Sequence, residues 1–144
     1  MKSASRRLLP LVAACLLSAC EPAPEPPSPA LPQLGQADGR VQWRGLLACA
    51  DCDGIEALLV LERQGDVHRY DLVETFLAGP EGARFAESGQ WRLEDGMLRL
   101  QGERGALRLY ALLPDGRLQP RDGRGRPFRR RDGDFLVPAD ADVR

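Results

Sequence analysis

Residues 55–76, with the sequence IEALLVLERQGDVHRYDLVETF, decide the fold class of this 144-residue chain. Residues 55–61 are an apolar run, and residues 67–76 alternate so that Tyr70, Leu72 and Phe76 share one face. The turn signal Gln64-Gly65-Asp66 joins the two runs. A short helix over residues 55–61 is the alternative, but the turn favours a strand. The stretch therefore predicts a β-hairpin.

Two polar side chains on the second run have different expected roles. Glu74 lies in phase with Tyr70 and Leu72, so its carboxylate points inward and needs a partner. His68 is the only histidine, and we expect it to be an exposed strand residue. A Ser-His-Asp grouping cannot be assembled convincingly around it, and the glycines mark turns rather than a phosphate-binding loop. The sequence therefore predicts no enzyme.

The rest of the chain repeats the pattern of short strands and turns. Turn signals occur at residues 94–96 and 114–116, residues 78–84 form a loop, and Gly89 could mark a bulge. Further strands are expected over residues 40–46, 85–93, 97–101, 106–112 and 117–120. The fold class is all-β, a small antiparallel barrel or sandwich over residues 38–137, followed by a flexible tail at 138–144.

The first 19 residues read as a secretory signal peptide. Lys2, Arg6 and Arg7 precede an apolar run that is too short to span a bilayer. The run ends in Leu17-Ser18-Ala19-Cys20, which resembles the bacterial lipobox that directs lipid onto the cysteine. The alternative is an ordinary signal peptide that happens to be cleaved before a cysteine. Lipidation of Cys20 is favoured because the leucine, both small residues and the cysteine are in register.

A lipidated Cys20 would anchor the protein without a transmembrane helix. Each buried methylene of an acyl chain, such as palmitate, contributes about 0.8 kcal/mol. Glu21 rather than Asp follows the lipid site, which favours the outer membrane and a periplasm-facing protein. Residues 20–37 form a linker whose proline-rich part, residues 21–32, would extend about 37 Å at roughly 3.1 Å per residue.

Cys49 and Cys52 are the only thiols expected in the mature chain, because Cys15 leaves with the signal peptide. Three roles fit the pair. A disulfide would hold a turn in place and stabilise the fold by roughly 2 kcal/mol. Two thiolates would instead suit Cu(I) as ligands. A thiol-disulfide enzyme fits least, because the neighbouring residues do not resemble the start of a thioredoxin-type helix and the carboxylates would raise the thiol pKa values. The disulfide ranks first and copper, the one cofactor considered, ranks second.

Charge makes nucleic acid an unexpected partner. The signal peptide removes three basic residues, so the mature chain has 17 Arg against 21 acidic residues. Its net charge is therefore about −4. The segment 129–131 is a run of three arginines that could touch anionic lipid, but Asp132 and Asp134 beside it favour a solvated turn.

Several motifs together resemble the N-terminal domain of the NlpE copper-resistance lipoproteins. The most specific is the Cys-Ala-Asp-Cys-x-Gly-Ile core, and the segments that carry the resemblance are residues 43–55, 59–61, 70–77, 85–91 and 118–123. Longer members of the family add an OB-like domain with further cysteines.

The resemblance implies a lipocalin-like β-barrel anchored at the outer membrane through Cys20. It maps the family cysteines onto Cys49 and Cys52, and it implies roles in envelope-stress signalling and copper tolerance through an envelope protein partner. A direct Cu(I)-binding protein is the alternative. A carrier of small apolar ligands is a further alternative that rests only on the barrel shape.

Overall fold

The structure, a computed structural model, describes residues 37–79 and 82–139, so the predicted signal peptide, Cys20 and most of the predicted linker lie outside the described residues. These residues form an all-β fold, as predicted. The strands are β1 (Gly39–Leu47), β2 (Ile55–Gln64), β3 (Val67–Phe76), β4 (Ala83–Glu94), β5 (Met97–Gly102), β6 (Leu107–Leu112), β7 (Leu118–Arg121) and β8 (Val137–Ala139). Among the described residues, no helix is long and apolar enough to cross a membrane.

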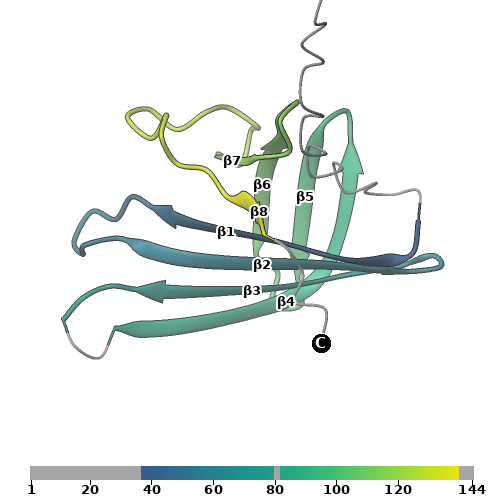
Figure 1. Cartoon of the computed structure of the whole chain (residues 1–144), viewed down its shortest axis with the longest axis horizontal. Coiled ribbons are helices and arrows are strands. Elements are labelled where there is room, and N and C mark those ends of the chain that lie inside the picture. Colours follow the sequence, from purple (N-terminus) through teal and green to yellow (C-terminus); the bar gives the residue numbers. More distant parts are fainter. Residues whose placement is uncertain (1–36, 80–81, 140–144) are drawn as a thin grey trace, which may run out of the picture.

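The strands form one antiparallel sheet that curls into a nearly closed barrel. The order is β7-β6-β5-β4-β3-β2-β1-β8, so β1 to β7 are a simple meander and β8 returns to pair with β1. Leu118 at the start of β7 exchanges two backbone hydrogen bonds with Leu136, just before β8. This pair links the two ends of the sheet. In Figure 1, β1 to β4 run side by side while β5 and β6 cross them steeply.

The predicted turns join their strands as expected. Glu94 pairs with Met97 across Asp95 and Gly96, which have φ angles of 51° and 74°. Positive φ at both central residues matches the right-handed twist of a hairpin, and Asp-Gly adopts it at low cost. Gln64 pairs with Val67 across Gly65 and Asp66, and in this turn only Gly65 has a positive φ, of 58°.

Strand β4 changes partner at Gly89. Residues 83–90 pair with β3 and residues 89–94 pair with β5, without a break in either register. The bulge that the sequence suggested at Gly89 is therefore absent. The glycine is needed for another reason, because a Cβ there would overlap the backbone oxygen of Gln101. Gly89 lets β4 bend sharply at a corner of the barrel.

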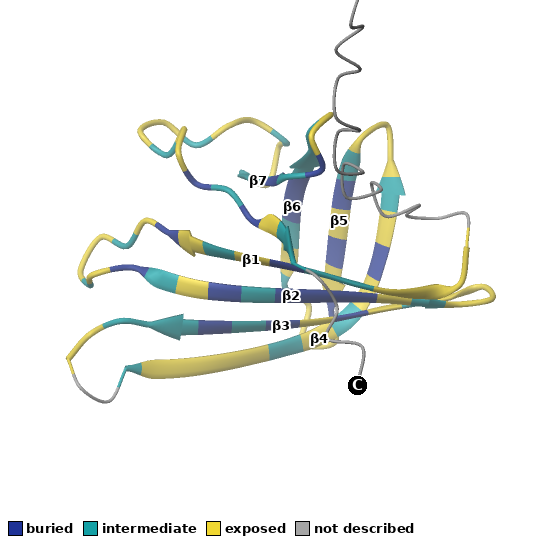
Figure 2. Ribbon diagram, in the orientation of Figure 1, coloured by how far each residue is buried: buried dark blue, intermediate teal, exposed yellow. Residues whose placement is uncertain are grey.

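The barrel is filled by its own side chains. The largest fully buried ones are Trp43, Tyr70 and the leucines 59, 61, 72, 98, 100, 118 and 136. Figure 2 shows buried positions alternating with less buried ones along β3 and β5, whereas the first half of β4 is exposed. Trp43 also donates a hydrogen bond from Nε1 to the carbonyl of Gly116, 2.9 Å away, and so ties β1 to the turn before β7.

His68 is on the inner face, contrary to the sequence expectation. It has the same parity as Tyr70 and Leu72, and its ring stacks on Trp91 with a centroid distance of 4.5 Å. The Nε2 atom is buried and has no hydrogen-bond partner among the residues that the structure describes. The expectation of exposure rests on His68 being opposite in phase to Val67, but Val67 is itself 50% exposed, so the phase of His68 is the inward one.

The C-terminal end of the fold extends beyond the predicted boundary at Val137. Pro138 and Ala139, which the sequence analysis assigned to a flexible tail, belong to β8 and pair with Trp43 and Gln42. Proline is tolerated here because β8 is an edge strand.

Candidate functional site

Cys49 and Cys52 lie in the connection between β1 and β2 and form a disulfide, with their Cα atoms 5.3 Å apart. The first-ranked of the three roles is thus the one that the structure contains. Asp51 and Asp53 beside them are exposed. A disulfide has no thiolate to offer, so the donor set that copper would need is missing in this oxidation state.

The other candidate ligands do not gather around the cysteines. His68 lies at the opposite end of β3 from Phe76, which pairs with the first residue after the cysteine loop. Within residues 37–79 and 82–139, no group of three or more His, Cys, Asp or Glu side chains could hold a metal ion. The described residues therefore do not fit a resident copper site around the oxidised pair.

Backbone hydrogen bonds hold the cysteine loop on one side. Asp53 donates to the carbonyl of Leu77 and Leu77 donates to the carbonyl of Gly54, both at 2.9 Å. These bonds extend the β2–β3 pairing beyond Ile55. The second half of the loop is therefore anchored to the end of β3 independently of the disulfide.

A clamp from the C-terminal segment holds the first half of the loop. The N–H of Ala48 donates to Asp134 Oδ1 at 3.1 Å, and Arg131 donates to the carbonyl of Ala48. Arg131 and Asp134 form an ion pair of 3.2 Å, and Asp134 is buried. The sequence predicts a solvated turn at residues 129–131, but Arg131 makes a structural contact with Ala48 and Asp134. Nothing in the sequence indicates that it reaches a residue 83 positions away.

A second candidate site is a cluster of charges inside the barrel. Glu74 on β3, Glu87 on β4 and Arg108 on β6 come together although β6 is adjacent to neither other strand. Arg108 binds Glu74 through both Nη atoms at 3.2 and 3.0 Å, and binds Glu87 through Nε and Nη2, both at 3.2 Å. Tyr70 donates to Glu87 at 2.6 Å. Arg108 is the partner that the inward-facing Glu74 requires.

Burial and charge shift the pKa values around this cluster. Burial alone would lower the pKa of Arg108, but Glu74 and Glu87 outweigh it and raise that pKa. Burial, followed by the hydrogen bond to Glu87, raises the pKa of Tyr70. Burial raises the pKa of Tyr110 to about 12. At neutral pH the arginine is therefore charged and both tyrosines are protonated.

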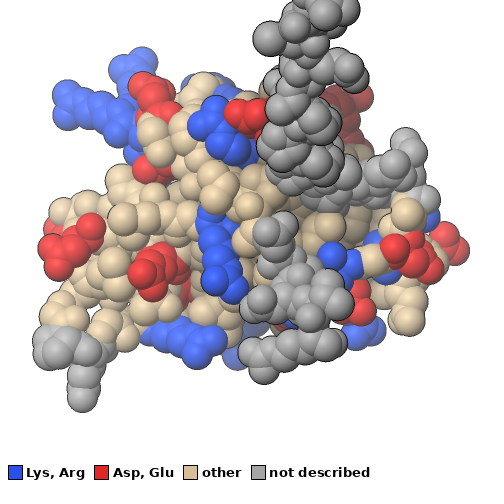
Figure 3. Space-filling view, in the orientation of Figure 1, with Lys and Arg blue, Asp and Glu red and all other residues tan. Residues whose placement is uncertain are grey.

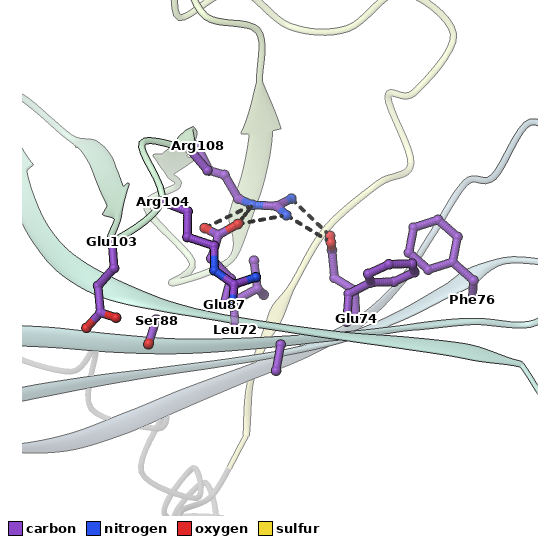
Figure 4. Close-up of a pocket in the computed structure, with 11 residues that line it drawn as sticks. Leu72, Glu74, Phe76, Glu87, Ser88, Glu103, Arg104 and Arg108 are labelled. Atoms are coloured by element: carbon purple, nitrogen blue, oxygen red, sulfur yellow. Dashed lines mark hydrogen bonds and ion pairs between the residues drawn. The ribbon is translucent and has the colours of Figure 1, made fainter.

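A pocket of about 500 Å³ opens beside the cluster. Its floor is the cluster itself, and its apolar wall is formed by Leu72, Phe76 and Phe85. The rings of Phe76 and Phe85 meet edge to face with centroids 5.3 Å apart. Figure 4 shows Arg108 reaching across the pocket to both carboxylates. The sequence does not reveal this pocket, because its lining combines the β3–β4 hairpin with residues 103–108, and β6 is not a sheet neighbour of either strand.

Comparisons with known proteins agree with this fold. The NlpE N-terminal domain family model matches residues 43–130. Lipoprotein NlpE of Escherichia coli (strain K12) is 37% identical over 87 residues, which are 60% of this chain and 35% of that protein. The crystal structure of the Cpx pathway activator NlpE from Escherichia coli aligns with a TM-score of 0.53 and 36% identity, over 61% of this chain and 44% of that one. The chain thus spans about a third of the length of the curated relative.

Proposed function

Because the chain belongs to the NlpE N-terminal domain family, we propose that it is a lipid-anchored interaction module in bacterial envelope-stress signalling. The observation that carries the proposal is the extent of the family match, which includes the cysteine loop and all three residues of the charge cluster. The curated relative is named a lipoprotein, and the solved relative is described as an activator of the Cpx pathway.

The proposed location follows from the N-terminal sequence. Cys20 carries the lipid, the linker of residues 20–37 holds the barrel away from the membrane, and the barrel faces the periplasm from the outer membrane. The lipoprotein relative and the lipobox-like sequence both support this arrangement. Figure 3 shows basic and acidic side chains interspersed over the visible face. A specific anchor explains membrane attachment better than such a mixed surface does.

An interaction role fits the polar groups better than catalysis does. His68 is stacked on Trp91, and each member of the charge cluster is hydrogen-bonded within the cluster. A general acid or base must reach the substrate proton, whereas these groups are engaged with one another. The family relatives are described as lipoproteins and an activator, not as enzymes.

A reporter assay tests the signalling role. The chain is produced in Escherichia coli that lacks its own NlpE and carries a Cpx-dependent reporter. We expect a several-fold rise in reporter output. The lipid-deficient variant Cys20→Ala should leave the membrane fraction, and its reporter output should differ from that of the wild type. Baseline output from a correctly folded, membrane-bound wild-type chain would contradict the proposal.

Copper tolerance is proposed as an indirect result of the stress response. The two sulfurs of Cys49 and Cys52 are joined to each other and so unavailable as thiolates. Cells that produce the Cys49→Ser/Cys52→Ser variant should therefore retain the copper tolerance conferred by the wild type. Loss of tolerance in this variant, together with tight Cu(I) binding by reduced wild-type protein, would instead support direct binding.

A further inference from the structure

The first half of β4 has an open edge. Residues 83–88 pair with β3 on one side, but β5 pairs only with residues 89–94 on the other. Beyond Gly102, β5 turns away into the connection to β6. In the part of the chain that the structure describes, no strand lies against this half of β4 on its second side.

The backbone direction shows which groups are left without partners. The carbonyl of Ser88 accepts a hydrogen bond from the N–H of Glu103 at 3.0 Å, so the backbone groups of Ser88 point away from β3. Alternate residues of a strand point their N–H and C=O to the same side, so Arg84 and Ala86 also present theirs to the open edge. Two donors and two acceptors at strand spacing are the pattern that another extended backbone satisfies.

The residues of this edge do little to block such pairing. Natural edge strands are protected by proline, lysine, bulges or inward charges. Residues 83–88, ARFAES, contain neither proline nor lysine and pair with β3 without a bulge, and Arg84 is the one charged side chain among them besides Glu87. The one inward charge is Glu87, which Arg108 neutralises. The edge is therefore accessible to a further strand.

The pocket lies directly inside this edge. Phe85 and Glu87 line it from β4, and Ala106 and Arg108 line it from the opposite side. Phe85 is 58% exposed, which is unusual for an aromatic side chain on the inner face of a barrel and leaves its ring open to a visiting side chain. A strand added to β4 would point alternate side chains into the pocket, where the first surface they meet is Phe85 and Phe76.

We propose that the open edge of β4 docks an extended peptide segment of the signalling partner by strand addition, with an apolar side chain of that peptide held in the pocket against Phe76 and Phe85. The segment is short, about four residues, because the connection at Glu103 limits the edge at Ser88. It is neutral or basic, since Glu74, Glu87 and Glu103 outnumber Arg104 and Arg108 around the pocket. This inference rests on the proposed signalling function and names its docking surface.

The direct test measures binding of a defined peptide. The probe is the capped, dye-labelled peptide Thr-Val-Thr-Leu-Thr-Val-Thr, followed by fluorescence anisotropy against the folded wild-type chain. Ala86→Pro removes one outward N–H and should weaken binding at least tenfold, while the control Ala86→Val keeps that N–H and should bind like the wild type. Phe85→Ser, at a largely exposed side chain, should also weaken binding without unfolding the barrel. Thermal unfolding of each variant verifies the fold.

Each of the following results would overturn the inference. The first is equal binding by Ala86→Pro and Ala86→Val, or no binding to the wild type at millimolar peptide. The second is unchanged binding of a probe whose backbone is N-methylated, which would show that the pocket takes a side chain or small apolar molecule without strand pairing. The third is a wild-type dimer in sedimentation that Ala86→Pro dissociates, which would assign the edge to a second copy of the chain.

The reporter assay separates this inference from the proposed function. If the wild type activates the reporter, Ala86→Pro should lose most of the output and Ala86→Val should retain it. Full output from a folded Ala86→Pro variant would overturn the docking surface and leave the signalling role standing. If the wild type does not activate the reporter, the signalling role fails, and the peptide measurement still decides whether the edge accepts a strand.

Discussion

At the scale of single residues, the side chain of Arg108 links β6 to β3 and β4, which are not its neighbours in the sheet. Within residues 37–79 and 82–139, no strand lies on the second side of the first half of β4, and the arginine spans the resulting gap from β6 to reach carboxylates on β3 and β4. The two ion pairs therefore connect parts of the sheet that no hydrogen-bonded ladder joins. They are only partly desolvated, because the Arg108 side chain is 34% exposed.

Removing this arginine should destabilise the barrel. Arg108→Ala leaves Glu74 and Glu87 as uncompensated charges, and we expect a loss of about 2 kcal/mol in the free energy of unfolding, less than for a fully buried pair. Arg99→Ala, at an exposed position on β5, is the matched control and should change stability by less than about 0.5 kcal/mol. Urea unfolding measures both. Equal effects would show that the cluster contributes nothing to stability.

Tyr110 makes stability depend on alkaline pH. Burial raises its pKa to about 12 in the folded state, against 10.0 for the ordinary side chain. The folded state thus favours the protonated form, so this contribution is complete below pH 10 and is lost as the pH rises from 10 towards 12. Between pH 9 and 11 the wild type should lose about 1.4 kcal/mol more than Tyr110→Phe does in urea unfolding. Parallel pH curves for the two proteins would contradict this assignment.

At the scale of elements, β4 depends on a glycine at its corner. Gly89→Ala should cost about 3 kcal/mol, because the new methyl group would overlap the Gln101 carbonyl where β4 changes partner. Gly123→Ala is the control, since a Cβ there meets nothing within 4 Å. Thermal unfolding compares the two variants. A Gly89→Ala protein as stable as the Gly123→Ala protein would show that β4 can bend elsewhere.

The same element shows how far the sequence predicts this fold. Alternation and turn residues locate β1 to β7 within a few residues, because each strand pairs with its neighbour along the chain and each hairpin carries its own signal. The predicted bulge at Gly89 is wrong, because a glycine inside a strand is expected both at a bulge and at a corner where the strand bends. β8 was not predicted, because three residues with a central proline carry no alternating pattern.

The sequence likewise predicts some features of the candidate site and not others. The Cys49–Cys52 disulfide is a local feature of four residues and was ranked first from the sequence. The inward carboxylate of Glu74 was also predicted, but its partner was not, because Arg108 is 34 positions away on a strand that is not a neighbour of β3. Local periodicity fixes which way a side chain points, whereas the curvature of the sheet decides what it meets.

At the scale of the whole molecule, closure of the barrel depends on residues beyond the family match, which ends at residue 130. Leu136 is fully buried and exchanges two hydrogen bonds with Leu118. Its neighbour Phe135 passes so close to Gly45 that any Cβ there would overlap the Phe135 carbonyl. Asp134 adds the clamp on Ala48. Closure and the cysteine loop are therefore coupled through one segment, residues 131–139.

Truncation at two positions should distinguish how much residues 131–139 and residues 140–144 each contribute to stability. A chain that ends at residue 130 loses Leu136, β8 and the clamp, so Trp43 and Leu118 would lose their cover on one side. We expect this chain to bind a hydrophobic dye and to unfold without a sharp thermal transition. A chain that ends at Ala139 keeps every closing contact that the described residues make, and we expect it to unfold like the full chain. Cooperative unfolding at the full-length temperature after truncation at residue 130 would show that the meander of β1 to β7 closes on its own.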